Sequence, residues 1–141
     1  MTAARLAPRP FAVAYLAALA ALALLDALWL GVLSGDLYAR EMGALMADSV
    51  RVVPAVLFYL LYPLAVVYLA LGQAPSSRTE AIVRSVVLGL AAYGAYDLTN
   101  LAVIRGWPVG LSLVDWAWGG IVTGLAGLAG YAASWGRVTR R

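Results

Sequence analysis

The sequence predicts an all-α membrane protein built as a bundle of four transmembrane helices. Three observations support this prediction: 64% of the 141 residues are hydrophobic, only 12% are charged, and the apolar residues fall into four long runs. Ordinary soluble domains have roughly half apolar and a quarter charged residues. The composition therefore argues against a disordered tail, a nucleic-acid-binding module and an ordinary soluble enzyme.

Each run is long enough to cross a bilayer, which takes about 20 mostly apolar residues. The runs cover residues 11–33, 52–71, 85–104 and 109–135, and none holds more than one charge. Four buried helices of a soluble bundle would leave too little polar surface for solubility. A signal peptide has an apolar core of only about 7–15 residues, so we expect the first run to remain as a span. We interpret residues 1–141 as a single integral membrane domain.

The arginines predict the orientation of the bundle. With four spans, both termini and the loop between the second and third spans lie on the same side of the membrane. Seven of the ten basic residues, all arginines, fall on that side: Arg5, Arg9, Arg78, Arg84, Arg137, Arg140 and Arg141. Only Arg40, Arg51 and Arg105 fall on the other side. Positive charge is concentrated in cytoplasmic segments, so we expect both termini to be cytoplasmic.

The connections between the spans carry turn and cap signals. Residues 34–36 end the first helix, and several apolar residues after them fall near one helical face: Leu37, Met42, Leu45 and Met46. This pattern favours a short interfacial helix between the first and second spans, with a plain loop as the alternative. Ser77 and Glu80 match a capping box for the third helix. Residues 106–108 are typical of a tight turn before the fourth.

One aspartate interrupts each of the first, third and fourth spans, namely Asp26, Asp97 and Asp115. A charge in the middle of a membrane costs at least about 2.5–3.5 kcal/mol, so such residues are rare and mark functional sites by default. From the helical rise, Asp26 and Asp97 lie about 12 Å from the outer ends of their helices and Asp115 about 10 Å. The three acids therefore fall in one layer, in the outer half of the bilayer.

Donor side chains lie close to each acid along its own helix, and the second span offers Tyr59 at the same depth. Residues three or four apart share a helical face, and indole, phenol and amide groups donate hydrogen bonds to carboxylates. We therefore predict an inward-facing acidic and aromatic pocket. Its predicted residues are Asp26, Trp29, Tyr59, Tyr93, Asp97, Asn100, Asp115 and Trp118.

The sequence identifies no cofactor and no catalytic motif. It holds no cysteine and no histidine, and no metal site is predicted, although a divalent cation held by the three aspartates is an alternative. No span carries an arginine or lysine that would neutralise the acids. Three acids in a low-dielectric pocket do not all ionise, so either a proton or a cation is expected there.

Small residues on the third and fourth spans would allow close packing of helices. They are Gly89, Gly94, Gly119, Gly120, Gly124 and Gly127. The glycine-rich fourth helix is also a candidate surface for a homo-oligomer. The other expected partner is the lipid bilayer, whose anionic headgroups suffice to explain the terminal arginines without nucleic acid.

Three functions stay open at this level. The first is binding or processing of a lipid or other apolar small molecule, with Asp26, Asp97 and Asp115 as candidate acid–base groups. The second is a proton- or cation-coupled small transporter or channel component. The third is a non-catalytic membrane assembly subunit in which the aspartates are structural. Whether the protein is an enzyme is left open.

Several segments resemble a family of small bacterial inner-membrane proteins, domain-of-unknown-function family 2177. The resemblance rests on Leu25–Gly31, Phe58–Pro63, Tyr96–Ala102, Gly106–Pro108 and Val114–Gly119. It extends from about Ala14 to Tyr131, and Tyr96-Asp97-Leu98-Thr99-Asn100 is its most specific part. The resemblance implies a four-span protein of the bacterial cytoplasmic membrane, and it brings no established activity, substrate or cofactor.

Overall fold

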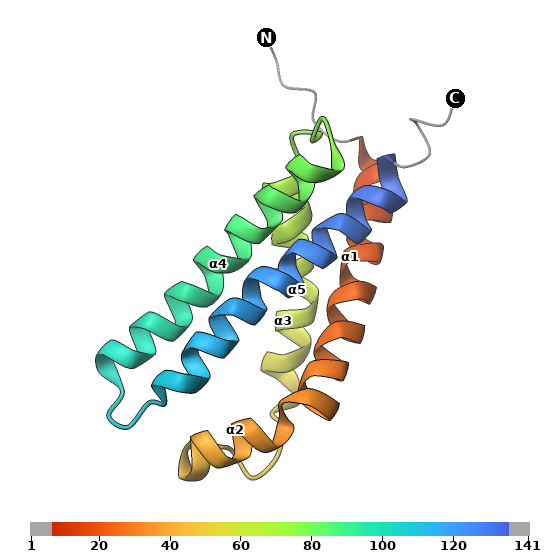
Figure 1. Ribbon diagram of the computed structural model, residues 1–141. Coiled ribbons are helices and arrows are strands. Elements are labelled where there is room, and N and C mark those ends of the chain that lie inside the picture. The colour runs from red at the N-terminus through yellow and green to blue at the C-terminus, as the bar shows by residue number, and fades with distance from the viewer. Residues whose placement is uncertain (1–6, 136–141) are drawn as a thin grey trace.

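The computed structural model describes residues 7–135, and these form the predicted bundle of helices (Figure 1). The all-α prediction is confirmed, and residues 7–135 contain no strand. Four helices are long and apolar enough to cross a membrane: Pro8–Leu33, Val52–Leu71, Arg78–Val103 and Val109–Trp135. Four arginines used in the orientation argument lie outside the described residues: Arg5, Arg137, Arg140 and Arg141.

The first span consists of α1 (Pro8–Leu28) and a π-helical continuation, η1 (Trp29–Leu33). Proline occupies the first turn of α1, where its missing N–H would have no helical partner. The span ends at Ser34, whose backbone N–H and hydroxyl both donate to the carbonyl of Trp29, at 2.7 and 2.8 Å. With both Ser34 donors on one carbonyl, the helix ends at the turn that the sequence predicts at residues 34–36.

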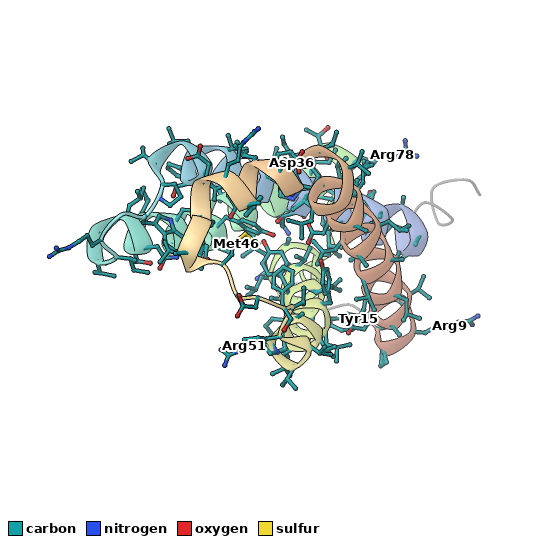
Figure 2. The ribbon with its side chains drawn as sticks, turned by 90° about the horizontal axis from the view of Figure 1, so that it is seen from below. Arg9, Tyr15, Asp36, Met46, Arg51 and Arg78 are labelled. Atoms are coloured by element: carbon teal, nitrogen blue, oxygen red, sulfur yellow. The ribbon has the colours of Figure 1, made fainter. Side chains whose placement is uncertain are left out.

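A short helix follows, as one of the two sequence interpretations predicted. This helix, α2 (Gly35–Met42), is followed by a 3₁₀ turn, η2 (Gly43–Leu45). Gly43 has a φ of +48°, which glycine adopts at little cost and which ends α2. Figures 1 and 2 show α2 crossing the end of the bundle where the turn between α4 and α5 also lies.

The second span is α3 (Val52–Ala65), continued by the π-helical segment η3 (Val66–Leu71). Pro63 lies inside α3, where it lacks an N–H and its ring crowds the preceding turn, and the π-helical turns follow directly. Val66, Val67 and Leu71 are fully buried, so η3 packs into the bundle. By contrast, α3 packs chiefly on α1, and the Tyr15 hydroxyl donates to the Leu60 carbonyl between these two helices (Figure 2).

The third span is α4 (Arg78–Val103), which begins seven residues before the apolar run. The predicted capping box is only half correct. The backbone N–H of Glu80 does donate to the Ser77 hydroxyl, at 3.1 Å. The Glu80 carboxylate, however, accepts from the backbone N–H and hydroxyl of Ser76 rather than from Ser77.

The fourth span, α5 (Val109–Trp135), lies at the centre of the bundle and packs along both α4 and α1 (Figure 1). The predicted tight turn precedes it, and Gly106 there has a φ of +76°. Five of its six glycines, all except Gly110, are buried against neighbouring helices of the same chain: a Cβ on Gly120 would lie 2.9 Å from Leu90. The homo-oligomer through this helix stays a prediction, and the glycine face is already occupied within one chain.

Candidate functional site

A cavity of about 670 Å³ lies among the helices, bounded by α1, η1, α2, α3, α4 and α5. Its walls are mainly aromatic and aliphatic. The lining residues are Asp26, Trp29, Leu30, Tyr38, Val50, Ala55, Phe58, Tyr59, Tyr62, Ala92, Tyr93, Tyr96, Asp115 and Trp118. Six of the eight residues proposed from the sequence are in this list, and Asp97 and Asn100 are not.

Asp26 is buried, with 6% of its surface exposed, and two other helices supply its hydrogen-bond donors. The indole N–H of Trp118 on α5 donates to Oδ1 at 3.0 Å, and the hydroxyl of Tyr59 on α3 donates to Oδ2 at 3.3 Å. Asp26 therefore ties α1 to α3 and α5. Both donors are neutral, so they solvate the carboxylate without cancelling a charge on it.

Trp29 and Trp118 form a parallel stack beside Asp26, with ring centroids 4.5 Å apart and an interplanar angle of 8°. The stack joins the end of the first span to α5 and makes one wall of the cavity. The indole nitrogen of Trp29 is buried and has no hydrogen-bond partner among the described residues. This nitrogen is shielded from the cavity, and the two indoles contribute aromatic surface to its wall.

The hydrogen-bond donor to Asp115 comes from the short helix at the end of the bundle, not from another span. The hydroxyl of Tyr38 on α2 donates a hydrogen bond to its Oδ1. Burial and this contact with Asp115 raise the pKa of Tyr38 further above physiological pH, where an ordinary phenol is already neutral and a donor. Tyr38 therefore links α2 to α5 at the cavity.

Asp97 lies outside the cavity. It is 2% exposed, and its Oδ2 is buried with no hydrogen-bond partner among the described residues. Asn100, one turn further along α4, is half-buried. The structure thus brings Asp26 and Asp115 to a common cavity and places Asp97 beside it.

Sequence reasoning did not assign Tyr38, Phe58, Tyr62 or Tyr96 to the site. Tyr62 shares a 2.7 Å hydrogen bond with the hydroxyl of Thr123 and meets the Tyr93 ring edge to face. Phe58 stacks on Tyr62. Tyr59 and Tyr62 are three residues apart, and this spacing was the signal that both belong to one face of the second span.

The described residues contain no cluster of three or more aspartate, glutamate, histidine or cysteine side chains that could hold a metal ion. Among residues 7–135 the one ion pair joins Glu80 to Arg84 on α4, at the opposite end of the bundle from α2. No arginine or lysine lines the cavity. The site is therefore acidic and aromatic, with hydrogen-bond donors supplied by indole and phenol groups.

Comparison with known proteins places the chain in a family. No curated protein and no solved structure matches the chain. One family model, described as a predicted membrane protein (DUF2177), matches residues 11–132, which include the second and third candidate spans entirely and most of the first and fourth. The chain therefore belongs to the DUF2177 family of predicted membrane proteins.

Proposed function

We propose that this protein binds a lipid or other apolar small molecule in the cavity between its spans. The observation that carries the proposal is the cavity itself, at about 670 Å³, with walls formed largely by aromatic rings. Small-molecule sites are typically clefts of roughly 300–1,000 Å³ lined by apolar and aromatic side chains with a few polar groups. Asp26 and Asp115 supply those polar groups here.

Access from the side of the bundle follows from the packing of α3. Among the other spans this helix contacts chiefly α1, and it has no comparable contact with α4 or α5. Phe58 and Tyr59 on α3, with Ala92 and Tyr93 on α4, form facing walls of the cavity. A molecule dissolved in the bilayer would enter between α3 and α4 without first crossing water.

The site is assigned to the outer half of a bacterial cytoplasmic membrane, with both termini in the cytoplasm. Two observations support this assignment. The cavity includes Tyr38 from α2, so it lies toward the end of the bundle that holds α2. The arginines predict that this end is the external one, because most of them belong to segments at the other end.

The test is cross-linking with a phospholipid that carries a diazirine on its acyl chain, using the full chain reconstituted in vesicles. We expect labelled peptides from the middle of α3 and from Ala92–Tyr96. Ala92→Trp fills the cavity, whereas Ala91→Trp adds the same ring at the exposed neighbouring position. Labelling should fall several-fold in Ala92→Trp alone, and equal labelling of both variants would contradict the proposal.

A second candidate is proton- or cation-coupled transport, and Asp97 is the observation that favours it. Its buried Oδ2 has no hydrogen-bond partner within residues 7–135, and ionisable residues inside membranes often mark proton or ion pathways. The test is proton flux into vesicles loaded with a pH-sensitive dye. Flux that depends on the protein and disappears in Asp97→Asn would support transport, and flux equal to that of protein-free vesicles would contradict it.

A further inference from the structure

The cavity has an unusual combination of groups for a purely apolar ligand. Two carboxylates from different helices reach it, Asp26 from α1 and Asp115 from α5, and its lining has no arginine or lysine to balance them. The described residues give Asp115 a hydrogen bond at Oδ1 alone. A neutral hydrocarbon would require both acids to be protonated, whereas a cationic head would balance the charge of ionised acids and an anionic head would be repelled by it.

The aromatic walls favour a cation of a particular kind. A positive group over the face of tryptophan, tyrosine or phenylalanine is attracted by the ring quadrupole, and quaternary ammonium groups are recognised in this way. The Trp29–Trp118 stack lies beside Asp26, and the edge-to-face pair Tyr62–Tyr93 lies on the facing walls. Carboxylates flanked by aromatic rings therefore match an ammonium ion.

A metal ion fits this site less well than an organic cation. The described residues do not group three metal-ligating side chains at one point, and a divalent ion prefers at least six oxygen ligands or retained water. A quaternary ammonium needs no directional ligands. Its methyl groups also suit the apolar remainder of the wall.

We propose that the ligand is an amphiphile whose ammonium head lies between Asp26 and Asp115 and whose tail extends toward lipid between α3 and α4. This inference rests on the proposed function, because it names the class of molecule held by the same cavity. The carboxylates and rings determine where the head lies. The tail is assigned to the side of the cavity where the backbones of α3 and α4 are not closely packed.

The test uses the full chain in nonionic maltoside micelles and three amphiphiles with the same brominated twelve-carbon chain. Their heads are trimethylammonium, hydroxyl and carboxylate, and bromine close to an indole quenches its fluorescence. We expect tryptophan quenching to reach half-saturation at about tenfold lower mole fraction for the ammonium than for the other two heads. The preference should disappear in Asp26→Asn/Asp115→Asn, and also in Asp115→Asn alone, whose amide oxygen can still accept from Tyr38.

The outcomes separate this inference from the function on which it rests. Equal quenching by all three heads, blocked by Ala92→Trp but not by Ala91→Trp, would overturn the ammonium assignment and leave apolar binding standing. Quenching that neither Ala92→Trp nor Ala91→Trp changes would overturn both the ammonium assignment and the proposal that the cavity binds an apolar molecule. Tetramethylammonium has the same head without a tail, and its displacement of the ammonium amphiphile at comparable concentration would overturn the assignment of an amphiphile. A head-group preference retained by the asparagine variants would overturn the role of the carboxylates.

Discussion

The indole of Trp118 donates its hydrogen bond to Asp26 on another helix rather than to Asp115, three residues away on its own helix. This bond links the first span to the last across the wall of the cavity. It also positions the Trp118 ring to stack on Trp29, so one residue joins the polar and aromatic parts of the site.

Replacing Trp118 by phenylalanine should destabilise the bundle. The change leaves the buried Oδ1 of Asp26 without its donor, and an unsatisfied buried polar group costs about 1–3 kcal/mol. Unfolding in mixed micelles, followed by circular dichroism, measures the loss. Trp135→Phe is the control, because Trp135 stacks on Tyr131 and its indole N–H donates no hydrogen bond among the described residues. Equal destabilisation by both variants would mean that ring size, and not the bond to Asp26, matters.

Replacing Tyr38 by phenylalanine should release α2 from the end of the bundle. The variant keeps the ring but loses the hydroxyl that donates to Asp115. Hydrogen–deuterium exchange of residues 35–45 should become faster, while exchange in the centre of α5 stays unchanged. Tyr68→Phe is the matched control, since Tyr68 is 63% exposed. Unchanged exchange in Tyr38→Phe would show that α2 is held by other contacts.

Adding one methyl group at Gly94 should strain the contact between α4 and α5. A Cβ there would lie 2.6 Å from the indole nitrogen of Trp116, which donates to the Leu90 carbonyl at 2.7 Å. Overpacking of this kind typically costs about 1–3 kcal/mol, so Gly94→Ala should unfold earlier in the same micelle assay. At Gly110 an added Cβ has no heavy atom within 4 Å. Gly110→Ala should therefore be neutral or stabilising, and the reverse order would contradict the packing described here.

The orientation can be tested with single cysteines, because the chain has none of its own. Asp48 and Gln73 are exposed residues in connections at opposite ends of the bundle. With cytoplasmic termini, a membrane-impermeant maleimide should label Asp48→Cys in intact cells and should label Gln73→Cys only after lysis. The opposite pattern would reverse the proposed topology and place the cavity in the inner half of the membrane.

Most of the fold could be predicted because spans are determined by the length and continuity of apolar sequence. The second and fourth spans begin and end where the apolar runs do, at 52–71 and 109–135. The third begins earlier, at Arg78, because the Ser77 cap and not the first apolar residue starts that helix. The two π-helical segments were not predicted. Hydropathy does not indicate whether a backbone N–H bonds to the carbonyl four residues earlier, as in an α-helix, or five residues earlier, as in a π-helix.

The sequence could indicate many of the residues that line the candidate site, but it could not indicate which of them form hydrogen bonds with one another. Helical spacing groups residues on one face of a helix, but it does not say which other helix supplies the hydrogen-bond partner, as Trp118 shows. Asp97 is rotated about 40° from Tyr93 around the axis of α4, which is enough to place one beside the cavity and the other in its wall. Tyr38 was not predicted, because it lies between the first and second spans and the path of that connection across the bundle depends on tertiary packing.

The central position of α5 has a consequence for biogenesis. The helix that both α1 and α4 contact most extensively is the last of the four to leave the ribosome. The first three spans have far fewer contacts with one another than with α5, so they would enter the membrane as loosely associated segments. A nascent chain that stops before Val109 would lack the element around which the others assemble, and quality-control proteases would be expected to remove it.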